Sequence, residues 1–390
     1  MPVPNRIADF APEMTEWRQD LHRHPELGFE ETRTSGIVAA KLAEWGIEVH
    51  RGLAKTGVVG VLRNGSSGRS IGLRADMDCL PMEETNAFGH RSTVPGKMHA
   101  CGHDGHTATL LGAARHLAET RNFDGTVHFI FQPAEEGGGG AGVMVREGLF
   151  ERFPCDAVYG IHNDPSLELG EAAAVAGTVL AASDRVGITV RGRGGHAARP
   201  HIAIDPVLVG AQIVVALQAL VSRRTDPLDS AVISITQFHA GSAGNVIPEE
   251  AELYGTVRTL RPETQDMMER LITQVAQGTA AAHDAAAEVR YVRGYPPTVN
   301  HPAETERAAL AVARVLGGEQ VIRNRPPAMG GEDFSFMLLE RPGCFVKMGQ
   351  RGRDRGGVPL HNPGYDFNDE MLPLGAGYFA ALVEQELPRG

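Results

Sequence analysis

The feature that most constrains the fold is a change of pattern near the middle of the chain. Short apolar runs such as TGVVGVLR, SIGLRAD, TVHFIFQ and DAVYGIH first alternate with helical segments. This alternation is typical of buried strands in an α/β sheet. From Arg185 to Tyr295 the predicted order becomes strand, helix, strand, strand, helix, strand, which is ferredoxin-like. Segments of the first type resume after YPPTVN, so the middle region is predicted to be an insertion.

We therefore predict an α/β protein whose interrupted domain has a mixed, mostly parallel sheet. The two parts of that domain are expected at 1–183 and 298–390, with the inserted ferredoxin-like domain at 184–297. A chain of 390 residues is longer than one hydrophobic core usually serves, which agrees with two domains.

Charge and composition exclude several classes of partner. The net charge is −11, without a block of like charge, which argues against nucleic acid and anionic membranes. We find no N-terminal apolar segment of signal-peptide length and no run near the ~20 apolar residues that a membrane helix needs. These features predict a cytoplasmic protein without membrane partners. The cysteines are scattered and read as free thiols or ligands: Cys79, Cys101, Cys155 and Cys344.

A cluster of metal-binding residue types stands at His99 to His106, which reads HACGHDGH. A lone cysteine near a helix is usually an inert buried residue, but here it is surrounded by imidazoles. Cys101 and His103 can reach one ion from an extended backbone, and thiolate and imidazole suit borderline transition metals. Both are expected in the loop before a helix, whose dipole favours thiolate. His99 and His106 are expected to pack around the ligands.

Further candidate ligands follow other strands. Glu135 and Glu136 could be solvated acids, but they come directly after a buried strand. In extended backbone the two side chains point in opposite directions, so one can bind metal while the other acts as a base on water. His162 in GIHN and His361 in PLHNPGYDFND are the candidates for the remaining ligands.

Two acidic residues and two glycine-rich loops complete the set of candidates. Asp76 and Asp78 follow the strand SIGLRA and could orient ligands from outside the metal shell. EEGGGGAG and RGRGGHAARP lack the features of nucleotide-binding loops. His196 in RGRGGHAARP and Asn245 in GSAGNVIP are either solvent-exposed or hydrogen-bond donors to a substrate.

Seven strings taken together carry a family resemblance. MHACGHDGH, FQPAEEG, GIHN, RGRGGHAARP, GSAGNVIP, GGEDFSF and LHNPGYDFND, in this order, resemble the M20 metallopeptidase family. Within it they resemble the aminoacylase-like amidohydrolases, a branch that includes hippurate hydrolases and indole-acetyl-amino-acid hydrolases. Related M20 peptidases have a His-x-Asp pair in place of Asp76-Met77-Asp78 and a bridging aspartate in place of Cys101. Both changes point to the amidohydrolase branch.

The resemblance implies a metal-dependent hydrolase with two divalent ions per subunit and an inserted domain that serves as lid and dimerisation domain. Zinc fits the ligand set, and manganese, cobalt and nickel tolerate similar shells. By resemblance, Cys101 bridges the two ions, and the further ligands are His103, Glu136, His162 and His361. Glu135 is then the general base, and Gly330 and Gly331 line the substrate pocket. His196 and Asn245 reach the partner subunit's site, where His196 stabilises the oxyanion.

The predicted activity is hydrolysis of an N-acyl amino acid to a carboxylic acid and a free amino acid, in a homodimer or a tetramer. A dipeptidase, a deacetylase of N-acetylated intermediates and an N-carbamoyl amino acid hydrolase are alternatives on the same scaffold. A catalytically silent metal-binding relative is a more distant alternative, because the base and all five ligands are present.

Overall fold

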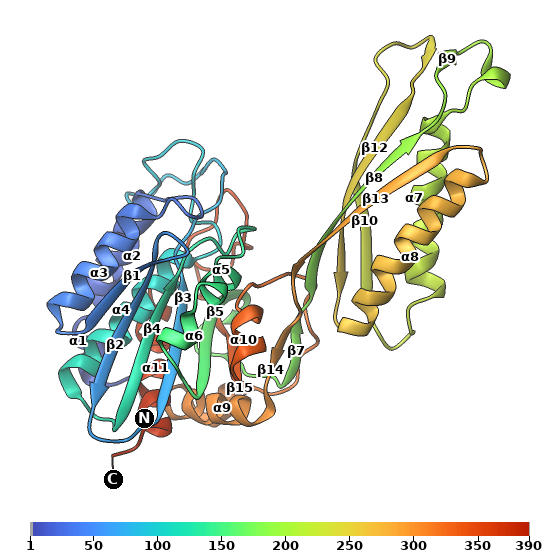
Figure 1. The fold of residues 1–390 in the computed structure, drawn as a ribbon. Coiled ribbons are helices and arrows are strands. Elements are labelled where there is room, and N and C mark those ends of the chain that lie inside the picture. Colours follow the sequence, from blue (N-terminus) through green and yellow to red (C-terminus); the bar gives the residue numbers. More distant parts are fainter. Residues whose placement is uncertain (1–2, 390) are drawn as a thin grey trace. The chain divides into compact units, whose positions relative to one another are not determined.

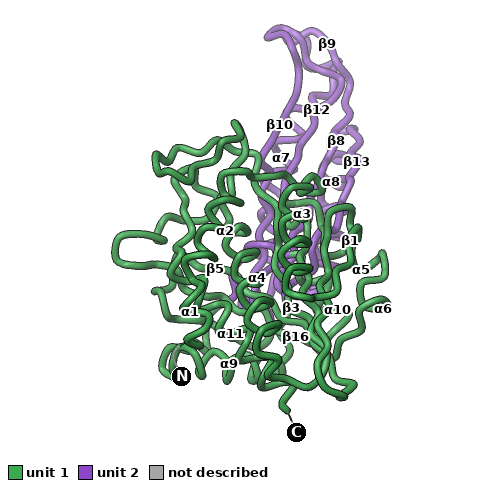
Figure 2. Tube along the Cα trace, turned by 90° about the vertical axis from the view of Figure 1, so that its left-hand side faces the viewer, with its two compact units in different colours: residues 1–177, 299–326, 333–390 green, residues 178–298, 327–332 purple. Residues whose placement is uncertain are grey.

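The computed structural model describes residues 3–389 and divides into two compact units, each described by itself (Figure 2). Unit 1 contains the chain up to Gly177, Val299–Pro326 and the chain from Asp333 onward. Unit 2 contains Thr178–Thr298 and Pro327–Glu332.

Unit 1 is built on an eight-stranded sheet with the order β1-β2-β4-β3-β5-β16-β6-β15 (Figure 1). The central pairs β4–β3, β3–β5 and β5–β16 are parallel, as is β6–β15, whereas β1–β2, β2–β4 and β16–β6 are antiparallel. The expected mixed, mostly parallel sheet is thus confirmed. Its strands are β1 (Glu48–Leu53), β2 (Gly57–Asn64), β3 (Ser70–Asp76), β4 (Gly125–Gln132), β5 (Ala157–Glu168), β6 (Ala172–Ala173), β15 (Val321–Ile322) and β16 (Gly343–Arg351).

Helices cover both faces of this sheet (Figure 1). α4 packs against α2 and α11, α11 packs against α9, and α5 packs against α10. The core between helices and sheet contains Phe129, Phe131, Leu110, Leu111 and Phe379, all fully buried. The helices are α1 (Asn5–Asp9), α2 (Ala11–Arg23), α3 (Thr32–Glu44), α4 (His103–Thr120), α5 (Gly140–Arg146), α6 (Leu149–Arg152), α9 (Pro302–Leu316), α10 (Ser335–Glu340) and α11 (Met371–Glu386).

The start of α4 requires two glycines. Gly102 precedes the helix with a φ of +92°, which side chains rarely adopt. At Gly105 a Cβ atom would lie only 2.3 Å from the ring of Phe367, so this turn can pack closely only without a side chain. The helix begins at His103, three residues earlier than the expected start at His106. His103 therefore lies in the first helical turn and not in the preceding loop.

Unit 2 has the order β8, α7, β10, β12, α8, β13, and its antiparallel sheet runs β10-β12-β8-β13. This confirms the predicted ferredoxin-like topology. Asp205 caps α7, accepting from the backbone N–H groups of Val207 and Leu208, and Pro206 occupies its first turn. The elements are β8 (Ala182–Arg191), α7 (Pro206–Arg223), β10 (Ala231–Ala240), β12 (Glu250–Thr259), α8 (Pro262–Ala281) and β13 (Ala286–Tyr295).

One side of the α7 helix packs into the core of unit 2, through Val209, Ile213 and Leu217. Leu208 and Val215, in the same helix, are 53% and 73% exposed. α7 is also the one helix among residues 3–389 whose length and composition would allow it to cross a membrane. That criterion is weak evidence, since an apolar helix against a sheet meets it too.

The remaining short elements include a small ribbon and the strands near the ends of unit 2. β9 (Gly195–His196) pairs with β11 (Val246–Ile247), and η1 (Pro200–Ile202) lies between β9 and α7. β7 (Gly177–Leu180) pairs with β14 (Thr298–Asn300), and η2 is Gly318–Gln320. The predicted domain boundaries stay a prediction. The compact units differ from them at Thr178–Ser183, Thr298 and Pro327–Glu332, which group with unit 2.

Candidate metal centre

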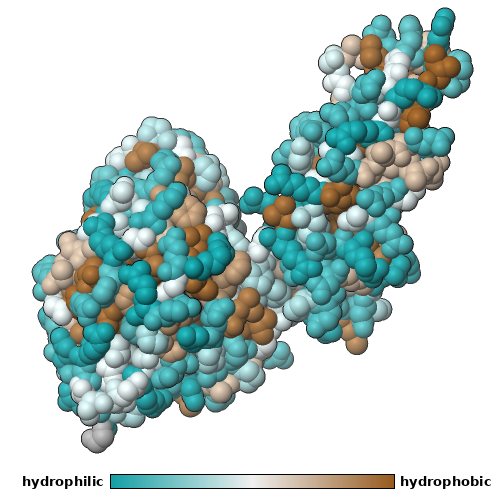
Figure 3. Space-filling view, viewed as in Figure 1, coloured by the Kyte–Doolittle hydropathy of each residue, from teal (hydrophilic) through white to brown (hydrophobic). Residues whose placement is uncertain are grey.

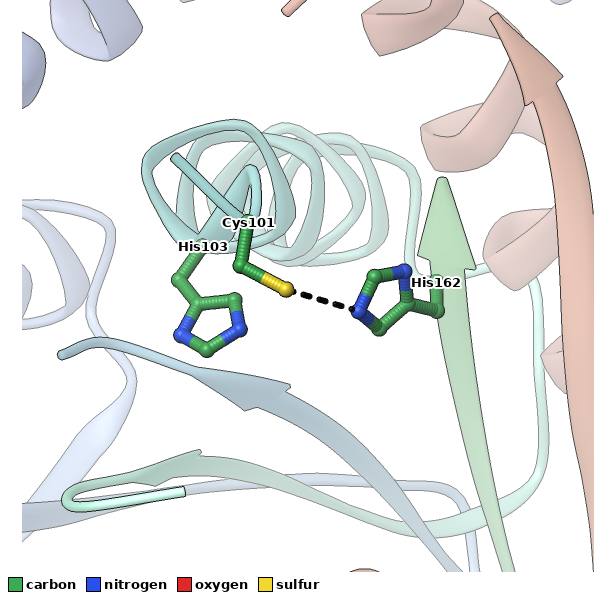
Figure 4. A group of neighbouring side chains, drawn as sticks. All are labelled: Cys101, His103 and His162. Atoms are coloured by element: carbon green, nitrogen blue, oxygen red, sulfur yellow. Dashed lines mark hydrogen bonds between the residues drawn. The ribbon is translucent and has the colours of Figure 1, made fainter. Parts of the chain in front are cut away.

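Two chain segments of unit 1 bring Cys101, His103 and His162 together. Cys101 and His103 flank the start of α4, whereas His162 stands on β5, just beyond the last residue of that strand that pairs with β3. Cys101 Sγ points toward His162 and lies 3.4 Å from its Nε2 (Figure 4). All three side chains are at most 7% exposed. β5 continues to Glu168, so His162 lies within a strand and not at its end as expected.

The hydrogen bonds of the two histidines leave one nitrogen of each ring facing the cluster. His103 Nδ1 lies 2.9 Å from the carbonyl oxygen of Asp78, and His162 Nδ1 lies 2.7 Å from that of Asn163. A carbonyl oxygen only accepts, so each Nδ1 carries a proton, and in the neutral ring Nε2 keeps the lone pair that a metal ion would bind. His103 Nε2 is buried without a hydrogen-bond partner, which is unfavourable unless a cation fills the position.

Glu135 and Glu136 follow β4 in a turn, which corrects the expectation of extended backbone at these residues. Ala134 has a φ of +54°, and the Asp78 carboxylate accepts the backbone N–H groups of both glutamates, at 3.0 and 2.9 Å. This turn places both carboxylates and His103 within 4.8 Å of one another. Glu135 is 7% exposed, and Glu136 Oε1 is buried without a hydrogen-bond partner.

His361 approaches the cluster from the loop before α11. Its backbone N–H donates to the carbonyl oxygen of Ala100 at 2.8 Å, and its φ is +61°, a conformation that costs energy in a histidine. Its Nε2 lies 3.2 Å from Glu136 Oε1 in an ion-pair contact. Its side chain is 54% exposed, so this is the solvent-facing side of the cluster.

Cys101 belongs to two groups of candidate ligands. It lies within 4.8 Å of His103 and His162 in one group, and of Glu136 and His361 in the other. Two ligand sets that share one sulfur have the composition of a dinuclear centre with a bridging thiolate. The buried His103 Nε2, which has no hydrogen-bond partner, fits this arrangement, and so does Glu136 Oε1 beside His361.

The acidities of the cluster reflect burial and neighbouring charge. Burial, together with the Glu136 charge, raises the pKa of the Cys101 thiol to about 12. Burial would also lower the pKa of His103, but Asp76 raises it well above the usual value. Burial and Lys347 lower the pKa of His162. Without metal the thiol is therefore protonated, and metal binding must displace that proton.

Asp76 and Asp78 lie beside the proposed ligands. Asp76 Oδ1 lies 2.6 Å from His106 Nδ1, and its Oδ2 accepts from Arg74 at 2.8 Å. Arg74 and His103 hold the pKa of Asp76 well below its usual range despite complete burial. Asp78 contacts His103 and both glutamate N–H groups, as described above. The proposed role of these acids in orienting ligands agrees with these contacts and stays a proposal.

The remaining predicted site residues lie in unit 2. His196 is exposed on β9, and Ala197 donates its N–H to the carbonyl oxygen of Asn245 at 3.0 Å, so His196 and Asn245 share the β9–β11 ribbon. Gly330 and Gly331 lie in a loop whose Gly330 carbonyl accepts from Ala181. Their roles toward a substrate stay proposals.

One residue that the sequence analysis did not single out is Asn163. It directly follows His162 in GIHN, and that adjacency was the only signal in the sequence. In the structure it is completely buried and contacts His106, Gln350 and Tyr365.

Comparison with known proteins identifies the family. Residues 72–385 match Peptidase family M20/M25/M40. The chain belongs to the M20 family. It is 42% identical to hippurate hydrolase of Campylobacter jejuni over 377 residues, which cover 97% of each chain. It is 39% identical to IAA-amino acid hydrolase ILR1-like 2 of Arabidopsis thaliana, over 99% of this chain and 89% of the relative.

A solved structure gives the same result. The Bacillus subtilis YXEP protein, described as a dinuclear metal binding peptidase from the M20 family, is 36% identical and superposes with a TM-score of 0.84, over 96% of this chain and 98% of that chain. The expected family is therefore confirmed, and with it a metal-dependent hydrolase of amide bonds on a catalytic domain with an inserted lid domain.

Proposed function

We propose that this M20 enzyme hydrolyses N-acyl amino acids, releasing a carboxylic acid and a free amino acid. The observation that carries the proposal is the pair of ligand groups that share Cys101, with the Glu135 carboxylate beside them. The relatives support the substrate class, since their names refer to hippurate and to an amino acid conjugate.

Two divalent ions would be held by Cys101, His103, Glu136, His162 and His361. Bound there, they would supply Lewis acidity to the amide carbonyl and lower the pKa of water toward ~7. Zinc fits this donor set, and manganese, cobalt and nickel are accepted by similar sets.

Glu135 is the proposed general base. Its carboxylate is mostly buried beside His103 and Glu136, where it would face a water molecule bound at the cluster. It accepts a proton from the water as the oxygen attacks the amide carbon, and it then donates that proton to the leaving nitrogen as the C–N bond breaks. Water is consumed, and one carboxyl group and one amine are formed.

His196 and Asn245 are proposed to contact the substrate from a partner subunit, with His196 donating to the developing oxyanion. Gly330 and Gly331 are proposed to line the pocket. In support, the imidazole of His196 is exposed on the β9–β11 ribbon, where it can meet another molecule. Asp76 and Asp78 are proposed to orient the ligands.

A homodimer, or a tetramer built from it, is proposed for the assembly. Hydrophobic residues lie on the surface of unit 2, including its β9 end (Figure 3), among them Leu208, Val215 and Val246 at 53%, 73% and 53% exposure. Contact with a second copy would cover apolar surface of this kind. We also propose a cytoplasmic location, with which the four free, buried cysteines agree.

The test is a hydrolysis panel run on metal-free protein, with Zn²⁺, Mn²⁺, Co²⁺ or Ni²⁺ added back. Hippurate, N-acetyl amino acids, N-carbamoyl amino acids and dipeptides are the substrates. We expect metal-dependent cleavage of hippurate or N-acetyl amino acids. Cleavage confined to dipeptides or to N-carbamoyl amino acids would replace the substrate class, and no cleavage with any metal would refute the activity.

A further inference from the structure

Asn163 lies where the segments that carry the proposed ligands meet. Its Nδ2 donates to the hydroxyl of Tyr365 at 2.7 Å and to Gln350 Oε1 at 3.1 Å. Its Oδ1 lies 2.7 Å from His106 Nε2. These three partners stand on the loop after His361, on β16 and on α4. One completely buried amide thus joins three segments of unit 1.

The backbone of Asn163 adds two contacts. Its carbonyl oxygen accepts from His162 Nδ1 at 2.7 Å, which fixes the rotation of that ring and turns Nε2 toward Cys101. Its N–H lies 3.1 Å from His106 Nε2. His106 is in turn held by Asp76 at 2.6 Å, so the position of Asn163 is set by a buried carboxylate.

Steric contact links Asn163 to the loop between Cys101 and His103. A Cβ atom at Gly102 would lie 2.6 Å from Asn163 Oδ1 and 2.7 Å from the Tyr365 hydroxyl. The glycine backbone therefore rests directly on these two side chains. Loss of the Asn163 amide would remove the surface on which the Cys101–His103 loop is supported.

We propose that Asn163 is a positioning residue that sets the separation of the ligand-bearing segments and thereby the affinity for metal. The proposal rests on the proposed function only in taking Cys101, His103, His162 and His361 as ligands. Partners of metal ligands typically change metal affinity about 10–100-fold when they are removed.

The test is a chelator-competition measurement of Zn²⁺ affinity for the full chain. Asn163→Ala is compared with Asn300→Ala, because Asn300 is 1% exposed and also makes three hydrogen bonds, to Val175 and Phe345. Both variants lose a buried amide that contacts β16, but only Asn163 also contacts α4 and the loop after His361. We expect Asn163→Ala to bind at least one ion about tenfold more weakly, and Asn300→Ala to bind as wild type.

A milder variant keeps the test informative if Asn163→Ala does not fold. Tyr365→Phe removes one hydroxyl, the acceptor for Asn163 Nδ2, and should weaken Zn²⁺ binding about two- to tenfold. At saturating Zn²⁺ the kcat of Asn163→Ala should recover toward wild type, since no ligand or base is lost.

Wild-type Zn²⁺ affinity in both Asn163→Ala and Tyr365→Phe would overturn the proposal. So would an equal loss of affinity in Asn300→Ala, since the effect would then be general destabilisation. The binding readout uses no substrate. Wild-type protein that binds Zn²⁺ but cleaves nothing on the panel would refute the proposed function and leave this inference standing.

Discussion

The proposed metal centre of unit 1 and the β9–β11 ribbon of unit 2 hold their candidate functional side chains in different ways. Cys101, His103 and His162 are at most 7% exposed and are held by hydrogen bonds from several segments. His196 stands exposed on a two-residue strand. The comparison teaches that the first site is preorganised by its own chain, whereas the second can act only when another surface or a substrate meets it. Substitutions in the two regions should therefore differ in their effects.

The largest effect is expected at the shared sulfur. Cys101→Ala removes the one donor common to both ligand groups, so hydrolysis of the best panel substrate should fall by at least about 10³-fold. The matched control is Cys155→Ala in the same unit, because Cys155 is 6% exposed and belongs to none of the ligand groups among residues 3–389. Steady-state kinetics give the activity of the two variants, and metal analysis gives their metal content. Equal losses in the two variants would break the comparison.

The next largest effect is expected at Arg18, which holds the loop after His361 in place. Arg18 is completely buried, and its guanidinium contacts Asp369 at 2.6 and 2.8 Å and Asp366 at 3.0 Å, in the loop that follows His361. Arg18→Met leaves these carboxylates without their cation and should lower the free energy of unfolding by about 3–5 kcal/mol.

Arg6→Met is the control, because Arg6 also pairs with a carboxylate, that of Glu119, but is 46% exposed. This substitution should change the free energy of unfolding far less than Arg18→Met, because an exposed ion pair contributes little to stability. Urea unfolding of the wild type and both variants at one pH measures these changes in the free energy of unfolding. A small effect for Arg18→Met would mean that unit 1 is less preorganised than its contacts indicate.

In the β9–β11 ribbon, a substitution should lower activity without changing stability or metal content. His196→Ala should raise the activation barrier by about 3 kcal/mol, as the loss of an oxyanion donor does, with unchanged unfolding and metal content. His239→Ala, another exposed histidine of unit 2, is the control and should keep full activity. If the site is shared, mixed dimers of inactive His196→Ala and Glu135→Gln chains should recover activity. Full activity in His196→Ala would remove this residue from the mechanism.

The smallest effect is a pH dependence in unit 1. Burial alone would lower the pKa of His22, but Asp104 and Glu84 outweigh it and raise the pKa to about 9. The folded state then holds this proton more tightly than the unfolded state. The resulting stability is fully present below pH ~6.5 and is lost as the pH rises through about 9.

Between pH 7 and 9 this loss should amount to about 2 kcal/mol in the wild type. His22→Gln should lack that part of the slope in urea unfolding. An identical pH dependence in the two proteins would show that His22 does not hold a proton tightly in the folded state.

The sequence predicted the topology because apolar periodicity survives in each strand and helix, as in β3, β4 and β5 and in the order of unit 2. It could not predict that β5 continues past His162, because that extension is set by pairing with β16, a strand far along the chain. It also misplaced the start of α4. Its first turn is fixed by the Gly102 conformation and by the contact with Phe367, which are not local signals.

The site shows the same division between local and distant causes. The residue types around Cys101 and Glu135 were visible in short strings. The turn at Glu135 and Glu136 was not, because the Asp78 carboxylate creates it. The raised pKa of the Cys101 thiol was not visible in the sequence, since it follows from burial and from the distant Glu136. Asn163 was overlooked because its importance lies in its contacts with His106, Gln350 and Tyr365, which are distant in sequence.

A calorimetric titration of metal-free protein with Zn²⁺, followed by an assay of the same samples on the best panel substrate, tests the central claim most directly. The account predicts two ions per chain for the wild type and for Glu135→Gln, with hydrolysis about 10²–10⁴-fold slower in the variant. Fewer than two ions per wild-type chain, or near-wild-type turnover by Glu135→Gln, would contradict it.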